Sequence, residues 1–273
     1  ILKSEEFQIK KLIKISDPKE DKRTLFIWPE GIFYQSSLED IKKYQALFKN
    51  NFSEKHLIIL GINNFVNFDN LNGEKYFNSL VVLNHELDIL SLYNKINLVP
   101  FGEFLPFEET LSRLGLKKIT RGYSSFSSGE KRDTINLGHK FNLKKILPLI
   151  CYEIIYPGNV KTKNQIPDLV VNISEDAWFG NSIGPYQHFA KAIYRSVEEG
   201  LFIARSANKG ISAFIDPNGR VIKSLKTGES GNIELNFPHF NHYTLFSNYG
   251  NKIFFLIILL YIFLTLFLKR FKI

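Results

Sequence analysis

The amino-acid sequence predicts an α/β domain followed by a single membrane-spanning helix. Apolar runs typical of buried strands alternate along the chain with helical segments and local hairpins, and this order predicts one mixed sheet or two sheets. A last apolar segment without any charge predicts the membrane helix. With 273 residues, of which 44% are hydrophobic, the chain is long enough to bury a substantial core.

The chain is basic, but its charges are not arranged for nucleic acid. The formal net charge is +8, yet Lys and Arg are scattered among acidic residues, and no basic stripe with interleaved aromatic residues occurs. We expect a solvated basic surface and no nucleic-acid partner, with attraction to anionic lipid as a second possibility. Because the chain begins at Ile1 and contains no Met, we expect it to be the C-terminal part of a longer protein.

In the first half of the chain we expect helices and strands in alternation. A helix is expected within residues 1–20, and a second from Ser37 to Lys49, where Asp40 stands three residues after the capping Ser37. Strands are expected at Thr24–Trp28 and His56–Ile62, and a hairpin at Ser79–Leu83 and Asp88–Tyr93. The following segment, Leu98–Pro106, contains two prolines and a glycine and is predicted to be an apolar loop. It would serve as a lid or a lipid-facing surface, or would simply cover a core edge.

The second half continues with buried strands around one strong helix. The spacing of apolar residues predicts a helix over Gly184–Glu199, with Gly200 as its C-cap. Strands are predicted at Ile146–Ile150, Pro167–Ile173, Leu201–Arg205, Ile211–Ile215, Val221–Leu225 and Ile233–Phe237.

The segment Ile253–Leu268 predicts a transmembrane helix because it consists almost entirely of Leu, Ile and Phe. At about −0.3 to −0.6 kcal/mol for each of these residues, insertion into a bilayer is favourable by roughly 4 to 8 kcal/mol. A buried core helix is the alternative, but core helices seldom lack a polar face. Lys269, Arg270 and Lys272 follow the segment, so the positive-inside rule places the C-terminus in the cytoplasm and the α/β domain on the opposite side.

The only cysteine, Cys151, directly follows a predicted buried strand. A lone cysteine is often an inert apolar side chain, but α/β enzymes place their chemistry at the carboxyl ends of strands. Glu30 and Lys95 also follow a predicted strand or hairpin. If the three converge, Lys95 can favour the thiolate and stabilise an oxyanion, and Glu30 can act as general base and then general acid. This set of side chains predicts acyl transfer through a thioester.

A Cys-His pair is the alternative use of the thiol, with His139 or His188 as the base. Neither histidine lies at a predicted strand end, so we favour the Glu-Lys-Cys set. The sequence has no zinc-ligand spacing and no phosphate-binding glycine loop, so we expect neither a metal nor a cofactor.

The motifs around these residues resemble a known family. Trp28-Pro29-Glu30, Tyr93-Asn94-Lys95 and Cys151-Tyr152-Glu153 look like the triad motifs of the nitrilase superfamily. Further segments are similar to the apolipoprotein N-acyltransferases within it: Tyr93 to Glu103, Asp176-Ala177-Trp178-Phe179-Gly180, and Pro185-x-Gln187-His188. The chain departs from the family at Glu175, where Asn is usual, and at Gly200-Leu201, where an Arg is common.

The resemblance implies a nitrilase-like α-β-β-α sandwich over residues 25–238 and a transmembrane helix over residues 252–269. Residues 1–24 would be an N-terminal remnant of the domain, with its first strand and the upstream membrane helices absent. The catalytic domain would lie on the periplasmic side of the bacterial inner membrane.

The resemblance also implies a reaction and roles for the site residues. Cys151 would take an acyl chain from a phospholipid and pass it to the N-terminal amine of a diacylglyceryl-cysteine apolipoprotein, with Glu30 as acid and base and Lys95 as oxyanion partner. Glu103 would be a supporting carboxylate, and Tyr152 and Glu153 would shape the site. Two alternatives stay open: a membrane-tethered amidase that uses water as acceptor, and a membrane-tethered binding domain without catalysis.

Overall fold

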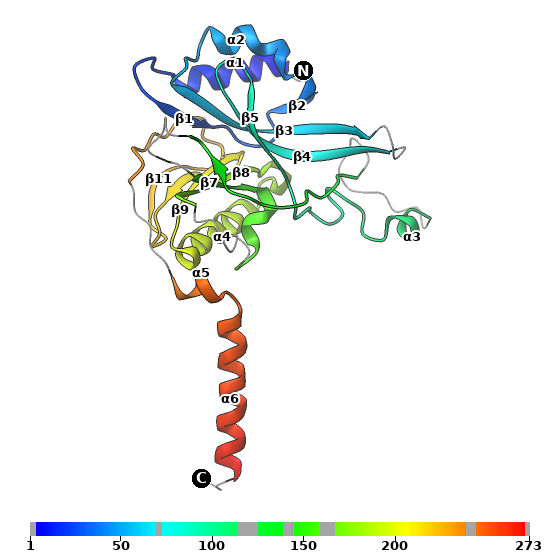
Figure 1. The fold of residues 1–273 in the computed structure, drawn as a ribbon, viewed down its shortest axis with the longest axis vertical. Coiled ribbons are helices and arrows are strands. Elements are labelled where there is room, and N and C mark those ends of the chain that lie inside the picture. The colour runs from blue at the N-terminus through cyan, green and yellow to red at the C-terminus, as the bar shows by residue number, and fades with distance from the viewer. Residues whose placement is uncertain are drawn as a thin grey trace.

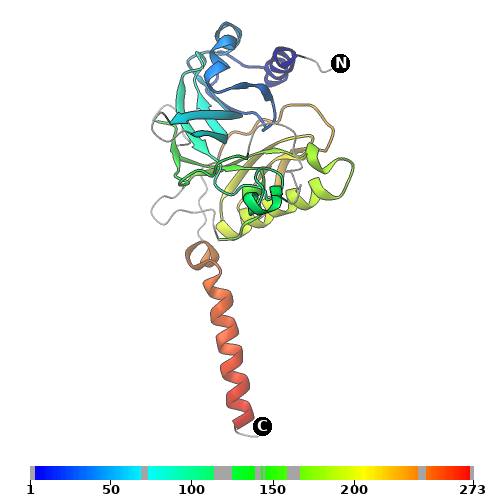
Figure 2. The same cartoon turned by 90° about the vertical axis from the view of Figure 1, so that its right-hand side faces the viewer.

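Two β-sheets form the centre of the protein in the computed structural model, which describes residues 4–68, 73–113, 125–138, 143, 145–158, 167–238 and 244–270. Figures 1 and 2 show the layers in order: helices α1 (Glu5–Ser16) and α2 (Gln45–Lys49), the first sheet, the second sheet, helix α4 (Gly184–Glu199), and then helix α6 (Lys252–Arg270), which extends away from the domain. This is the α-β-β-α sandwich that the sequence predicts.

The first sheet contains the N-terminal strands. Its order is β1, β3, β4, β5, with β2 also paired to β3, and the strands are β1 (Thr24–Ile27), β2 (Phe33–Ser37), β3 (His56–Phe68), β4 (Gly73–Leu83) and β5 (Ile89–Asn94). β1 and β3 are parallel, whereas β3, β4 and β5 are successively antiparallel. Glu30 therefore follows the carboxyl end of β1, and Lys95 follows the carboxyl end of β5.

The second sheet has a parallel centre and antiparallel edges. Its order is β11, β10, β9, β8, β7, β6, and the strands are β6 (Ile135–Asn136), β7 (Lys145–Ile150), β8 (Leu169–Glu175), β9 (Phe202–Asn208), β10 (Ser212–Ile215) and β11 (Val221–Leu225). β7, β8 and β9 pair in parallel. Parallel strands are covered on both faces, which explains why nearly every residue of β7 and β8 is buried and most of them are apolar.

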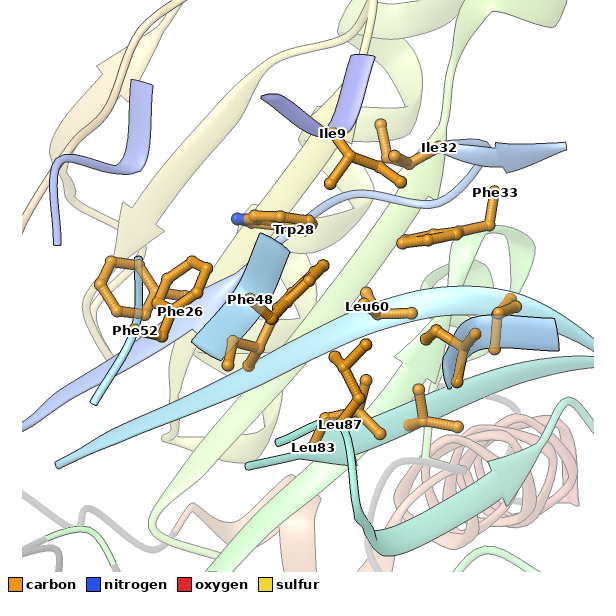
Figure 3. Close-up of a cluster of buried hydrophobic side chains, with 14 of the residues drawn as sticks. Ile9, Phe26, Trp28, Ile32, Phe33, Phe48, Phe52, Leu60, Leu83 and Leu87 are labelled. Carbon is orange, nitrogen blue, oxygen red and sulfur yellow. The ribbon is translucent and has the colours of Figure 1, made fainter. Parts of the chain in front are cut away.

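The alternation of side chains along β3 builds two hydrophobic cores at once. Ile58 and Leu60 point to the layer of α1 and α2, while Leu57 and Ile59 point to the space between the sheets. Successive residues of a strand face opposite sides, so a strand covered on both faces has no polar side. Figure 3 shows the core between the first sheet and helices α1 and α2, in which Trp28 lies beside Phe48.

The helices cover the outer faces of the two sheets. The first sheet is covered by α1 (Glu5–Ser16), the 3₁₀ helix η1 (Glu39–Tyr44) and α2 (Gln45–Lys49), and the second by α4 (Gly184–Glu199). The shorter elements are α3 (Glu108–Arg113), the 3₁₀ helices η2 (Cys151–Ile155) and η3 (Ala177–Phe179), and α5 (Leu245–Tyr249).

Two sequence expectations need correction. The helix predicted from Ser37 to Lys49 is divided into η1 and α2, because Ser37 ends β2 opposite Asn63 and its hydroxyl donates to Asp40. The predicted strand Ile233–Phe237 does not form: this described segment pairs with no strand, and the carbonyl of Glu234 accepts from the Lys223 side chain instead. β2 and the outer parts of β3 and β4 were not predicted, because their sequences are mixed and polar.

Helix α6 (Lys252–Arg270) is long and apolar enough to cross a membrane, and none of it is buried against the rest of the described chain. Its 19 residues span about 28 Å at about 1.5 Å per residue, close to the roughly 30 Å of a hydrocarbon core. α6 follows α5, and Thr244, which caps α5, donates to the carbonyl of Glu198 in α4. The apolar helix therefore leaves the domain from the α4 layer (Figure 1).

The packing of α1 generates a stability prediction. Ile9 is fully buried against the first sheet, whereas the neighbouring Lys10 is exposed. We expect Ile9→Ala to lower the free energy of unfolding by about 2–5 kcal/mol, because it leaves a cavity. Urea unfolding of the detergent-solubilised protein, followed by tryptophan fluorescence, measures this loss. Lys10→Ala is the matched control, with an expected change within about 0.5 kcal/mol; equal effects of the two substitutions would contradict the packing of α1.

Candidate active site

Glu30, Lys95 and Cys151 lie near enough to one another for the charge of Lys95 to act on the other two. Glu30 follows β1, Lys95 follows β5 and Cys151 follows β7. The backbone N–H of Glu175 at the end of β8 donates to Glu30 Oε2 at 3.0 Å, which joins the first sheet to the second.

Lys95 is a buried cation held by carboxylates. Its side chain is 1% exposed, and Nζ lies 2.9 Å from Glu103 Oε1. Burial opposes the charge on Lys95, but attraction to Glu103, Cys151 and Glu30 outweighs burial, so the pKa of Lys95 is raised. The ammonium group is therefore charged throughout the neutral range and can stabilise negative charge beside it.

Asn78 of β4 connects the two carboxylates of the site. Its Nδ2 donates to Glu30 Oε1 at 2.6 Å and to Glu103 Oε1 at 2.9 Å. Burial raises the pKa of Glu30, with repulsion from Glu103 adding to it and attraction to Lys95 opposing it. A carboxylate with a raised pKa is a suitable general base and general acid near neutral pH.

Cys151 lies at the junction of β7 and η2 with a φ of +49°, and the residue as a whole is partly buried. Burial and the charge of Glu30 raise the pKa of the thiol to about 11, although Lys95 lowers it. The resting group is therefore the thiol. Its proton has to leave during the attack, and Glu30 is the nearby base that can accept it.

Glu153 connects the residues around Cys151 to the residues that follow Lys95. This residue is 1% exposed. Its Oε1 accepts hydrogen bonds from Tyr93 Oη, the backbone N–H groups of Ile96 and Asn97, and Arg132 Nη2, and its Oε2 accepts from the Ile150 N–H. Tyr152, beside it, packs edge to face on Tyr156 at 5.4 Å.

The loop after Lys95 has no regular secondary structure except an isolated bridge between Pro100 and Phe104. The Val99 N–H donates to Glu103 Oε2 at 2.8 Å, so the loop supplies and orients the carboxylate that pairs with Lys95. Phe101 is 45% exposed on this loop. The predicted apolar loop is therefore attached directly to the ion pair of the site.

A second buried network of polar side chains contacts the backbone of Cys151. The sequence did not predict it. His188 Nε2 is 3.2 Å from the backbone oxygen of Cys151, and His188 Nδ1 is 2.9 Å from Asp176 Oδ1. Arg205 Nη2 lies 2.8 Å from Asp176 Oδ2. Burial alone would raise the pKa of Asp176, but the bond to His188 and the charge of Arg205 lower it to about 2. His188 thus contacts the backbone of Cys151, and His139 lies outside the described residues.

Asn78, Asp176, His188 and Arg205 are the residues of the site that sequence reasoning missed or placed differently. The available signals were the polar end of the strand before Asp176 and the two motifs that contain Asp176 and His188; Asn78 and Arg205 had none. Within the part of the chain that the structure describes, no group of three His, Cys, Asp or Glu side chains could hold a metal ion.

Glu175, the departure noted in the sequence, lies against the backbone that carries Glu30. A Cβ added to Gly31 would meet Glu175 Oε2 at 1.9 Å, and that oxygen accepts a hydrogen bond from Asn208 Nδ2 at 2.6 Å. Burial, together with repulsion from Glu30 and Asp176, raises the pKa of Glu175 to about 7. Between about pH 4.5 and pH 7, Glu175 is therefore protonated in the folded protein, whereas it is ionised in the unfolded chain.

This raised pKa generates a prediction about pH and stability. Because the pKa is higher in the folded state, the contribution of protonated Glu175 is fully present below about pH 4.5 and is lost as the pH rises through about 7. Glu175→Gln removes the titration, so the variant should gain stability relative to the unsubstituted protein between pH 5 and pH 8. Melting temperatures at the two pH values measure the gain. Glu54→Gln, at an exposed glutamate, is the control; a gain of the same size there would contradict the assignment to Glu175.

Comparisons with known proteins agree with this fold. The sequence matches the carbon-nitrogen hydrolase family over residues 14–236. It is 42% identical over 175 residues to a protein of Bradyrhizobium diazoefficiens named apolipoprotein N-acyltransferase, which covers 64% of this chain and 32% of the relative. It is 36% identical over 230 residues to the protein of the same name from Rickettsia prowazekii, covering 83% of this chain and 44% of the relative. The chain thus spans from 32% to 44% of the length of these relatives.

Solved structures of an amidase from Nesterenkonia sp. AN1 share the fold. One, with acrylamide added to the active site cysteine, has a TM-score of 0.55 at 14% identity and covers 82% of this chain and 84% of the amidase chain. Another, with the acetamide moiety of fluoroacetamide on that cysteine, has a TM-score of 0.56 at 14% identity, with 82% and 81% covered. At this identity the likeness shows the fold alone. The family match extends over most of the sequence, and we conclude that the chain belongs to the carbon-nitrogen hydrolase family.

Proposed function

We propose that this chain forms the acyl-transfer site of an apolipoprotein N-acyltransferase, with Cys151 as nucleophile, Glu30 as general acid and base, and Lys95 as oxyanion partner. The observation that carries the proposal is the buried Lys95 ammonium, which interacts with Glu30, Glu103 and Cys151 together. A buried cation beside a thiol and a carboxylate of raised pKa is an arrangement for covalent catalysis. The names of the relatives supply the transferred acyl group and the apolipoprotein acceptor, and the phospholipid donor is what the sequence resemblance implies.

In the first half-reaction, Cys151 Sγ attacks the carbonyl carbon of a phospholipid ester. The S–C bond forms, the thiol proton passes to Glu30, and the carbonyl oxygen becomes an oxyanion that Lys95 stabilises. When the tetrahedral intermediate collapses, the C–O ester bond breaks and Glu30 returns the proton to the leaving oxygen. The products are an acyl thioester on Cys151 and a lysophospholipid.

In the second half-reaction, the N-terminal amine of a diacylated apolipoprotein attacks the thioester carbonyl. The N–C bond forms, Glu30 takes a proton from the amine, and the S–C bond breaks. Cys151 leaves as thiolate and recovers its proton from Glu30. Glu103 keeps Lys95 in place through both halves, because the ion pair is 2.9 Å long and the side chain of Lys95 is buried.

Two features support a lipid substrate over a small soluble amide. Helix α6 can cross a membrane, which would hold the site near phospholipid, with the domain on the periplasmic side of the inner membrane. The loop around Phe101 places an exposed aromatic side chain next to the Lys95–Glu103 pair. An apolar loop at this position would also exclude water from the thioester, which favours transfer to an amine over hydrolysis.

The test uses the full-length enzyme embedded in phospholipid. Intact mass spectrometry should detect one added acyl chain on the unsubstituted enzyme and none on Cys151→Ala, because only the thiol can form the thioester. Adding a diacylated lipopeptide with a free amine should discharge the adduct and yield the triacylated peptide.

Two outcomes would contradict the proposal. Loss of the adduct at the same rate with and without the amine would identify a membrane-tethered amidase or hydrolase that uses water as acceptor. Absence of any adduct on the folded, unsubstituted enzyme would exclude acyl transfer through Cys151.

A further inference from the structure

Cys151 has a backbone conformation that its surroundings must hold in place. Its φ angle of +49° lies in the left-handed region, which side chains with a Cβ adopt rarely and only where neighbouring contacts fix them. The contacts that hold this conformation therefore decide where the thiol lies relative to Lys95 and Glu30.

The backbone oxygen of Cys151 is held by His188 from a different element of the fold. His188 lies in α4, is 6% exposed, and has its Nε2 atom 3.2 Å from that oxygen. A peptide oxygen can only accept a hydrogen bond, so Nε2 is the donor. The edge of the His188 ring is thus directed at the backbone of the nucleophile.

The ring of His188 is itself fixed on its other side. His188 Nδ1 lies 2.9 Å from Asp176 Oδ1 and 3.1 Å from Arg205 Nη2, and Asp176 also accepts from the Ser174 hydroxyl at 2.6 Å. Asp176 and Arg205 are 1% and 3% exposed. Arg205 lies in β9, so the position of the ring is set by the centre of the second sheet.

The hydrogen bond from His188 controls the peptide group that follows the nucleophile. The C=O of Cys151 and the N–H of Tyr152 belong to one planar trans peptide and point in opposite directions. Holding the oxygen therefore fixes the rotation of this peptide about the Cys151 Cα, and with it the direction of the side chain. No residue of the proposed chemistry other than Cys151 takes part in this contact.

We propose that His188 is a positioning residue that holds Cys151 in the orientation from which its thiol meets Lys95 and the acyl carbonyl. Asp176 and Arg205 act through His188 by fixing its ring. The proposal rests on the proposed function for the nature of the acyl donor, but the reactivity of the thiol can be tested without that donor.

The experiment measures the rate at which iodoacetamide alkylates Cys151 in the full-length enzyme, as a function of pH. His188→Phe keeps a flat ring but removes the donor. It should slow alkylation by about 10- to 100-fold, the size of effect that a misplaced reacting group causes. The midpoint of the pH profile should also move to higher pH, because the thiolate loses its contact with Lys95. His188→Gln, whose amide can reach the same oxygen, should recover most of the rate.

The chain offers a matched control in His56. This histidine is also buried, at 1% exposure, and its Nε2 also lies 3.1 Å from a backbone oxygen, that of Lys19, but it is in the first sheet among Phe26 and Phe52. His56→Phe should leave the alkylation rate and its pH profile unchanged even if it lowers the melting temperature. A merely structural role of His188 would produce the same result as His56.

The outcomes separate this inference from the proposed function. If His188→Phe alkylates at the unsubstituted rate, or if folded His188→Gln is as slow as His188→Phe, the positioning role is wrong. If His188→Phe does not fold, His188→Asn replaces it, since the shorter amide can reach Asp176 but not Cys151. A normal alkylation pattern in an enzyme that forms no acyl adduct from phospholipid would overturn the proposed function and leave the role of His188 standing.

Discussion

The geometry of the site depends on the hydrogen bonds of the Glu153 carboxylate. It accepts hydrogen bonds from the strand that carries the nucleophile, through Ile150, and from the segment after Lys95, through Ile96 and Asn97. Arg132 balances its charge at 2.6 Å. A buried carboxylate without such partners would be strongly unfavourable, so the two segments have to come together for the charge to be tolerated. The distance between Lys95 and Cys151 follows from this requirement.

The charges around Lys95 determine when the thiol can react. Burial and the negative charge of Glu30 raise the pKa of the Cys151 thiol to about 11, although Lys95 lowers it, so the thiol rests in its neutral form. Negative charge on sulfur becomes favourable only when Glu30 has taken up a proton, since Lys95 then has one fewer anion beside it. Proton transfer to Glu30 and attack by sulfur are thus coupled by electrostatics, which protects the thiol between turnovers.

The sequence located the strand ends but not the contacts between them. Glu30, Lys95 and Cys151 could be singled out because each follows a predicted strand or hairpin. The segment Ile233–Phe237 alternates apolar and polar residues as a half-buried strand does, but a strand also needs a partner edge, and a local pattern does not supply one. The contacts of the site join residues that are far apart in the chain. The hydrogen bond from Glu175 to Glu30, for example, joins residues 145 positions apart. Asn78 and Asp176 were missed because they act through such contacts. No local pattern can report such a pair.

Helix α4 connects the chemistry of the site to the apolar helix. Near its start, His188 contacts the backbone of Cys151, and near its end, the carbonyl of Glu198 accepts from Thr244, which caps the helix leading into α6. Ten residues at about 1.5 Å each separate these two contacts by about 15 Å along the helix axis. Because α4 packs on the second sheet through Phe189, Ala192 and Ile193, these two contacts belong to one element that rests on the sheet carrying the nucleophile. If α6 spans a bilayer, α4 therefore links the position of Cys151 to that of the membrane helix.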